Sequence, residues 1–258
     1  HRDLHSFPTR RSSDLTEAHF GRCRAWSSKP VGAAVASAGG FDPHELPPPW
    51  ICSVPGDSRL KVRDILGRGD FALISDLIPP ASKVLDLGCG DGALLAWLRE
   101  NKQVEARGVE LKRELVQKAV ARGVTVYQGD IDESVREYPE QAFDYVILSQ
   151  TLQETRQPLR VLDEMLRIGR HAIVAFPNFG HWRVRLNHLT SGRSPRTPTF
   201  PYAWHSSPNI HFLTVLDFEE SIAEQKLVVE KRRFLSGHSQ IEFMPNLFAA
   251  IAVYMVRR

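Results

Sequence analysis

The sequence predicts an α/β domain whose sheet is doubly wound and mostly parallel. Two observations support this fold class. From about Ser58 onward, short apolar runs of strand length alternate with segments whose apolar residues recur at helical spacing. A glycine-rich turn, "GCGDG", follows the first apolar run directly. This alternation is typical of parallel strands joined by helical crossovers, which bring the C-terminal ends of all the strands to one edge of the sheet.

The predicted elements follow one another closely up to Phe176. A first helix is expected over residues 70–78, because its apolar residues have helical spacing and Pro79-Pro80 ends it. Short apolar runs between polar turns predict strands that are buried on both faces. The expected strands are 83–87, 106–111, 124–128, 143–149 and 171–176, and the helices between them are 92–101, 112–123 and 157–169.

The chain beyond Phe176 is expected to be less regular. Residues 176–212 show no sustained period, and they follow the C-terminal end of a strand. A long segment at that place is typical of a lid or an interface. After it we expect a helix over 215–226 and strands over 227–235 and 247–258.

Residues 1–57 differ from the rest of the chain. The opening "HRDLHSFPTRRSSDL" is similar to a translated sequencing adaptor, and the segment has no sustained period of two or 3.6 residues. We therefore expect residues 1–57 to be a non-native or disordered leader, and residues 58–258 to form the domain.

Composition narrows the function classes. The chain has 258 residues and a net charge of only +3, so no general attraction to nucleic acid or to a membrane follows. Its cysteines, Cys23, Cys52 and Cys89, are too sparse for a disulfide framework, which favours a reducing, cytoplasmic location. No apolar run is long enough to span a bilayer.

Acidic residues surround the glycine-rich turn. Glycines at this spacing allow positive φ and a close approach of the backbone to a ligand. Four carboxylates fall at the expected C-terminal edge of the sheet: Asp86, Asp91, Glu110 and Asp130. A pyrophosphate would be repelled by these charges, whereas a cationic ligand would be attracted. Asp91 could instead cap the following helix.

S-adenosylmethionine (SAM) fits these charges, since it carries a sulfonium, an α-ammonium and ribose hydroxyls. Glu110 is well placed to accept the ribose hydroxyl hydrogens, and Asp86 to attract the cationic methionine end. Asp130 could accept from the adenine amine while Ile131 packs on the ring. A nucleotide-phosphate site and a set of helix caps are the alternatives, and Cys89 is interpreted as a small buried residue rather than a nucleophile. The predicted cofactor-binding residues are Asp86, Gly88, Cys89, Gly90, Gly92, Glu110, Leu111, Asp130, Ile131 and Ser149.

Several segments resemble known families. "VLDLGCGDG", "GVEL" and "QGDID" resemble motifs of class I SAM-dependent methyltransferases. "FDYVILSQTLQ", "NFGHWRVRL" and "SPNIHFLTVLDFE" are similar to the methionine-biosynthesis family MetW, from about Asp70 to the C-terminus. This resemblance implies a seven-stranded methyltransferase fold and a role in methionine synthesis together with a homoserine O-acyltransferase. It implies no methyl acceptor.

The insert at 176–212 is basic and aromatic. It contains four arginines and no acidic residue, together with several aromatic residues. This mixture suits a protein interface or an anionic substrate, although a solvated loop with some aromatics packed on the core is the simpler interpretation. Four arginines are few for nucleic-acid binding. A metal site is not expected, because the four histidines of the insert lack the usual paired spacing.

No general base stands out in the sequence. Methyl transfer is an in-line displacement in which positioning can supply much of the catalysis, so this does not exclude an enzyme. Gln150, His181 and His205 are the candidates at the edge of the expected pocket. Three functions stay open: a SAM-binding accessory protein of homoserine acylation, a methyltransferase acting on a small anionic substrate, and an RNA methyltransferase. The fourth strand ends in "SQTLQ" and lacks the Asn/Asp-Pro-Pro-aromatic sequence of many base-methylating enzymes, which disfavours the third.

Overall fold

The computed structural model describes residues 68–237 and 239–258. The chain divides into two units, His1–Val54 and Pro55–Arg258, and the described residues all belong to the second. The expected leader at 1–57 lies outside the described residues.

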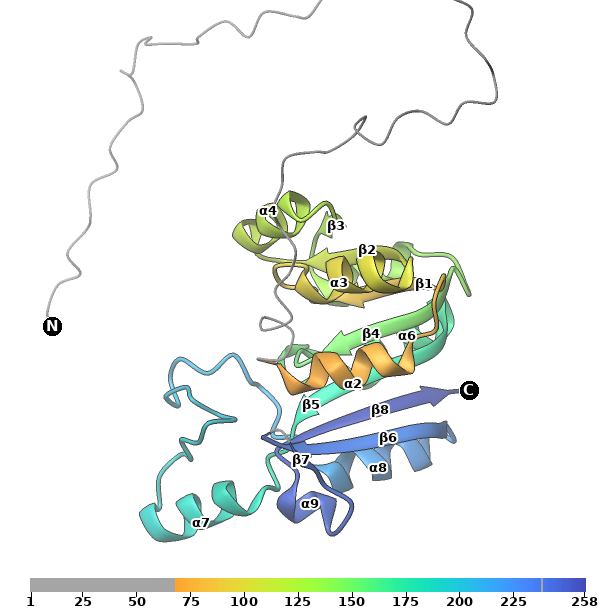
Figure 1. The fold of residues 1–258 in the computed structure, drawn as a ribbon. Coiled ribbons are helices and arrows are strands. Elements are labelled where there is room, and N and C mark those ends of the chain that lie inside the picture. Colours follow the sequence, from red (N-terminus) through yellow and green to blue (C-terminus); the bar gives the residue numbers. More distant parts are fainter. Residues whose placement is uncertain (1–67, 238) are drawn as a thin grey trace, which may run out of the picture. The chain divides into compact units, whose positions relative to one another are not determined.

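One mixed sheet forms the centre of the domain, in the order β3-β2-β1-β4-β5-β8-β6-β7 (Figure 1). The first five strands in this order pair in parallel, and β8, β6 and β7 add to the β5 edge in antiparallel pairs. The doubly wound, mostly parallel sheet is therefore confirmed, with eight strands in place of the expected seven. The strands are β1 (Lys83–Leu87), β2 (Glu105–Glu110), β3 (Thr125–Gln128), β4 (Phe143–Ser149), β5 (Gly169–Pro177), β6 (Val228–Ser236), β7 (Ser239–Gln240) and β8 (Ile251–Arg257).

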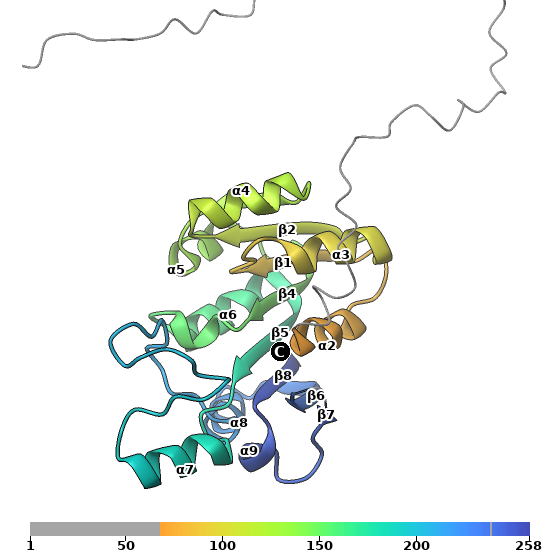
Figure 2. The same cartoon turned by 60° about the vertical axis from the view of Figure 1, so that its left-hand side comes forward.

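Helices cover both faces of the sheet (Figures 1 and 2). Neighbouring strand residues point to opposite faces, so each central strand contributes to two separate cores. In β4, for example, Val146 and Leu148 pack in one core and Ile147 in the other. The helices are α2 (Gly69–Leu77), α3 (Ala93–Lys102), α4 (Arg113–Ala121), α5 (Ile131–Ser134), α6 (Pro158–Ile168), α7 (Trp182–Ser191), α8 (Val215–Glu224) and α9 (Pro245–Phe248), with 3-10 turns η1 (Val135–Glu137) and η2 (Leu152–Glu154).

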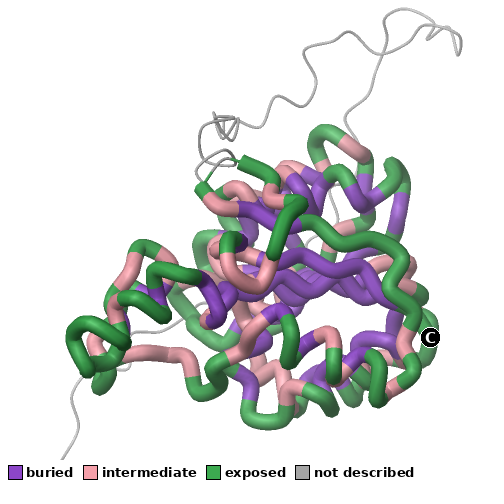
Figure 3. The backbone as a smooth tube through the Cα atoms, turned by 90° about the horizontal axis from the view of Figure 1, so that it is seen from below, coloured by how far each residue is buried: buried purple, intermediate pink, exposed green. Residues whose placement is uncertain are grey.

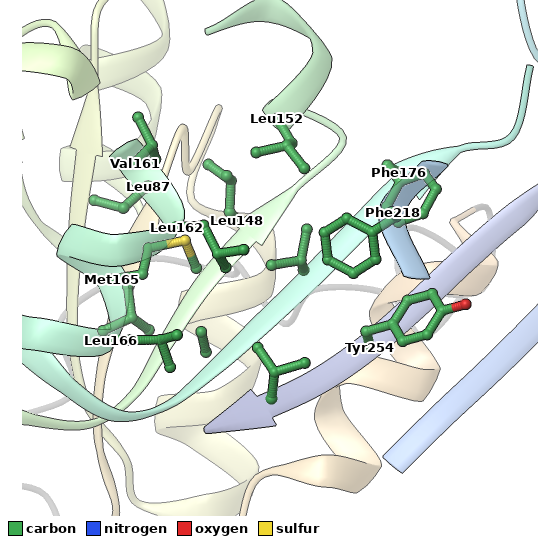
Figure 4. Close-up of a cluster of buried hydrophobic side chains, with 14 of the residues drawn as sticks. Leu87, Leu148, Leu152, Val161, Leu162, Met165, Leu166, Phe176, Phe218 and Tyr254 are labelled. Atoms are coloured by element: carbon green, nitrogen blue, oxygen red, sulfur yellow. The ribbon is translucent and has the colours of Figure 1, made fainter. Parts of the chain in front are cut away.

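The first core lies between the sheet and α6 and α8 (Figure 4). At one end of it, the rings of Phe176, Phe218 and Tyr254 meet with centroids 4.9–6.0 Å apart. The buried Tyr254 hydroxyl donates to Glu219 at 2.9 Å. The second core lies under α2 and α3, and Figure 3 shows the buried segments in the centre of the domain with exposed segments around them.

Two expectations for the second half of the chain were wrong. The insert is not irregular throughout, because α7 occupies Trp182–Ser191. The last strand begins at Ile251 rather than at residue 247, because Pro245–Phe248 forms the short helix α9. The buried Asn178 side chain holds this turn, since its amide donates to the carbonyls of Asn246 and Ala249 at 3.0 and 2.8 Å. No described helix has the length and apolar character needed to cross a membrane.

Candidate functional site

All the predicted cofactor-binding residues except Gly92 meet near the C-terminal ends of β1 to β4. Two adjoining cavities lie there, with volumes of about 630 and 390 Å³. They share Gly88, Gly90, Leu115, Arg68 and Ser149, so they are two lobes of one recess. A cavity of about 800 Å³ lies elsewhere, between α2, α8 and β6, and none of the predicted cofactor-binding residues lines it.

The three glycines of the turn have different roles, although all have positive φ. A Cβ added to Gly90 would meet no atom within 4 Å, so its flank is open beside the recess. A Cβ on Gly88 would lie 2.7 Å from the Thr151 hydroxyl, and one on Gly92 would lie 2.8 Å from the Cβ of Ala119. Gly90 thus leaves room for a ligand, whereas Gly92 allows α3 to approach α4 and lines neither lobe.

Glu110 is fixed by the backbone on both sides. Its carboxylate accepts the N–H of Gly90 at 2.9 Å and the N–H of Lys112 at 2.9 Å. The side chain is 7% exposed and lines the smaller lobe. The glycine turn and the end of β2 are therefore held together through this one carboxylate, which keeps further lone pairs that can accept hydrogen bonds.

Asp86 is the most unusual group of the site. It is 3% exposed, and its Oδ1 has no hydrogen-bond partner among the described residues. Burial raises the pKa of this carboxyl from 3.8 to about 7, and the charge of Arg68 only partly opposes the rise. Glu110 and Asp70 raise the pKa further by repulsion. A carboxylate in this position gains from a cation or a hydrogen-bond donor brought by a ligand.

Asp70 and Arg68 are site residues that the sequence analysis missed. Asp70 is 1% exposed, and the Arg68 guanidinium binds it at 2.7 Å. The Ser149 hydroxyl at the end of β4 donates to Asp70 at 2.8 Å, and Arg68 donates to Ser149 at 3.1 Å. An acidic residue in the first turn of a helix is the usual complement to the helix dipole, so nothing in the sequence distinguished Asp70.

The remaining acids have structural partners. Asp91 accepts from the N–H of Ala93, the first residue of α3, at 3.2 Å and pairs with Arg122 at 2.7 Å. The N-cap residue of α3 is Gly92, so Asp91 bonds the start of the helix from the position before the cap. Asp130 caps α5 by accepting from the N–H of Asp132 at 3.0 Å. Asp130 also lines the smaller lobe, together with Leu111 and Ile131. Leu111 is 60% exposed, so an apolar surface borders the recess at this end.

Cys89 is buried in the wall of the larger lobe. A Cβ on Gly108 would lie only 2.5 Å from its sulfur, so the thiol packs tightly against β2. Burial, together with the nearby carboxylate of Asp86, raises its pKa. The thiol is thus kept protonated and poorly nucleophilic.

The three catalytic candidates are not brought together. Gln150 lines the smaller lobe, has φ of 58°, and its Nε2 has no partner among the described residues. His181 is 5% exposed and caps α7, accepting from the N–H of Arg183 at 3.2 Å; its pKa is lowered mainly by burial. His205 is exposed and lies in the insert. Neither histidine lines the recess. Within 68–237 and 239–258, no group of His, Cys, Asp and Glu has the arrangement of a metal site.

Comparison with known proteins shows the family to which the chain belongs. The family described as "Methionine biosynthesis protein MetW" matches residues 68–256, which are nearly all of the described chain. The chain belongs to the MetW family. A curated relative, the bifunctional methionine biosynthesis protein MetXA/MetW of Rhodopirellula baltica, is 37% identical over 219 residues. These cover 80% of this chain but only 34% of the relative, so the chain spans about a third of that protein's length.

Solved structures show the same fold. A SAM-dependent methyltransferase of Thermotoga maritima, described as a possible histamine N-methyltransferase, matches with a TM-score of 0.54 and 16% identity, covering 73% of this chain and 87% of that one. A SAM-dependent methyltransferase of Mesorhizobium loti matches with a TM-score of 0.53 and 15% identity, covering 74% of this chain and 99% of that one. At these identities the comparison establishes the class I methyltransferase fold, as the glycine and acidic motifs predicted.

Proposed function

We propose that the chain binds SAM in the two-lobed recess and acts with a homoserine O-acyltransferase in methionine biosynthesis. The observation that carries the SAM assignment is the buried Asp86 carboxylate: its Oδ1 has no partner among the described residues, and Asp86 lines the same lobe as Gly90. At Asp86, the carboxylates of Glu110 and Asp70 act against the charge of Arg68. Over the two lobes together, the walls carry six acids and five cations, so a small excess of negative charge remains. A cationic ligand offsets this excess of negative charge, whereas a phosphate would add to it.

Each residue has a distinct part in this proposal. Asp86 attracts the cationic methionine end, and Gly90 lets the backbone approach the ligand. Glu110 accepts from the ribose hydroxyls with the lone pairs that Gly90 and Lys112 leave available. Asp130, Ile131 and Leu111 border the adenine. Ser149 stays bound to Asp70 and closes the recess at the end of β4. Bound SAM would supply an electrophilic methyl group.

The partner assignment is supported by the relative from Rhodopirellula baltica, whose name, bifunctional methionine biosynthesis protein MetXA/MetW, joins a second module of methionine biosynthesis to MetW in one protein. Two modules that are fused in one protein commonly work on the same task. We propose that this chain works with a homoserine O-acyltransferase in the cytoplasm. Because SAM is made from methionine, SAM binding would report the output of the pathway to an early step.

The test combines calorimetry with an acylation assay. SAM titrated into the full chain should release heat with one site per chain. The homoserine O-acyltransferase encoded in the same genome should bind the chain and change its acylation rate. A flat SAM titration refutes the recess assignment, and an acyltransferase that neither binds nor responds refutes the partner assignment.

Gln150 favours a second candidate, an active methyltransferase with a small anionic acceptor. Gln150 lines the smaller lobe, and its buried Nε2 has no partner among the described residues. Its positive φ costs conformational energy that a functional role would explain. An amide N–H there could hold an acceptor oxygen near the methyl group. Formation of S-adenosylhomocysteine when candidate acids are incubated with SAM would support this, and its loss in Gln150→Ala with unchanged SAM affinity would place the acceptor at Gln150.

A further inference from the structure

The helix α7 turns an apolar stripe outward. Trp182, Leu186 and Leu189 are 39%, 49% and 83% exposed, and their spacing of four and three residues places them on one face of the helix. Val184 is the only residue of α7 that is buried. Figures 1 and 2 both place α7 at the periphery of the domain, beside α9 and away from the sheet.

The helix α7 is not stabilised by burial of its apolar face, as surface helices normally are. Isolated helices shorter than about 12–15 residues are marginal in water, and surface helices normally bury their apolar face. The ten residues of α7 are held mainly at the ends, by the His181 cap and by a bond from Arg185 to the carbonyl of Gly180 at 2.6 Å. The outward stripe therefore has no structural use within the described chain, and exposed apolar clusters of this kind mark interaction sites.

Unpaired arginines flank the stripe. Arg183, Arg193 and Arg196 take part in none of the ion pairs of residues 68–237 and 239–258. Arg193 and Arg196 line a hollow of about 580 Å³ together with Trp204, whose side chain is 79% exposed. Arginine and tryptophan are the residues most enriched at binding hot spots. With no acid in 176–212, the surface favours an acidic partner.

We propose that α7 and the Trp204 hollow form the docking face for the homoserine O-acyltransferase, through a partner surface that is apolar in the centre and acidic at the rim. This rests on the proposed function, which names the partner. A second copy of the chain fits the face poorly, because a symmetric dimer would bring the same arginines together with no acid to pair with them. A phosphate-rich ligand would leave the leucine stripe exposed.

The test replaces the stripe and measures association with the acyltransferase by biolayer interferometry. In the full chain, Leu186→Glu/Leu189→Glu should weaken binding at least about 100-fold, because it puts two carboxylates opposite an apolar and acidic surface. Val120→Glu is the matched control: Val120 is 55% exposed on α4, far from α7 in Figure 1, and should bind like the wild type. Both variants should keep the wild-type SAM affinity.

Three outcomes overturn the proposal, and they are distinguishable. If the wild type binds and the double variant binds equally well, the docking face is wrong while the partner assignment stands. If the wild type does not bind the acyltransferase, both are wrong. If sedimentation shows a homodimer that the double variant abolishes, the occupant is a second copy. Arg193→Glu/Arg196→Glu should slow association and reduce its salt dependence, as expected for arginines facing an acidic rim.

Discussion

At the scale of single residues, Asp86 controls the electrostatics of the recess. Its pKa of about 7 results mainly from burial, and the ligand-free protein has no group at Oδ1 among the described residues to offset that cost. The carboxyl is thus about half protonated near neutral pH, and its ionised form is the one that a cationic ligand requires.

The affinity for SAM should therefore rise with pH. Between pH 6 and pH 8 the ionised fraction of a group with a pKa of about 7 increases from about a tenth to about nine-tenths, so binding should tighten roughly tenfold. Calorimetry at several pH values measures this. In Asp86→Asn this part of the pH dependence should disappear and binding should be weak throughout. An equal pH dependence in the two proteins would assign it to another group.

The same carboxyl should destabilise the ligand-free fold at high pH. Its pKa is raised above the unfolded value of 3.8, so the folded state holds the proton more tightly. The contribution of Asp86 to the free energy of unfolding is therefore fully present below about pH 4, and it is lost as the pH rises through about 7. Asp86→Asn should raise the free energy of unfolding at pH 8, by roughly 4 kcal/mol at most, and leave it nearly unchanged near pH 4. Urea unfolding at both pH values tests this, and a variant that is less stable at pH 8 contradicts it.

Glu110 should matter for both the ligand and the loop. Glu110→Ala should weaken SAM binding by about 1–3 kcal/mol, because it removes charge-assisted hydrogen bonds to the ribose. It also frees the N–H groups of Gly90 and Lys112, so Glu110→Gln, which keeps the size and one acceptor oxygen, is the companion variant. Unchanged affinity in Glu110→Ala would remove this residue from the site.

At the scale of elements, Asn178 joins three segments that are distant in sequence. Besides its bonds to the carbonyls of Asn246 and Ala249, its Oδ1 accepts from the N–H of Gly180 at 2.9 Å and from that of Val215 at 3.3 Å. One fully buried amide thus positions the start of α8, the approach to α7 and the turn at α9. Sequence periodicity holds no information about such a long-range clamp, which explains why residues 247–248 of α9 are predicted as part of the last strand.

Asn178→Ala should lower the free energy of unfolding by about 2–4 kcal/mol, since it leaves several buried backbone groups without partners. Chemical denaturation measures the loss. Asn101→Ala is the control, because the Asn101 side chain makes one exposed bond to the Trp97 carbonyl, and its removal should cost less than about 1 kcal/mol. Equal effects of the two substitutions would show that Asn178 is not a clamp.

At the scale of the whole molecule, the sequence was most informative where local pattern and burial agree. β1 and β4 have the predicted limits, because a strand buried on both faces is a continuous apolar run between polar turns. The part of the recess that is formed by strand ends could be predicted, because the C-terminal ends of parallel strands bring Asp86, Glu110 and Asp130 to one edge of the sheet. Arg68 and Asp70 could not be predicted, since their role depends on α2 lying across the end of β4. The insert helix α7 was missed because its apolar residues face outward rather than toward a core.

A continuous structural path through β5 joins the recess to α7, the proposed docking helix. β5 runs from the centre of the sheet to Pro177, and α7 follows it after four residues; Gln150, in the recess, donates its N–H to Ala175 of β5 at 2.7 Å. A ligand that contacts Gln150 and shifts its backbone can therefore change the position of α7 through β5. SAM affects partner binding only if it has different affinities for the free and the partnered chain.

We expect SAM to change the affinity for the acyltransferase by about 5- to 150-fold, which corresponds to a coupling of roughly 1–3 kcal/mol. Linkage requires the acyltransferase to change the SAM affinity by the same factor, so the two titrations check each other. Biolayer interferometry with and without saturating SAM gives the first factor, and calorimetry of SAM with and without the partner gives the second. If both affinities stay constant while SAM fills its site, the recess does not regulate the partner. If Gln150→Ala keeps both affinities but removes the coupling, the path through β5 is the one that carries it.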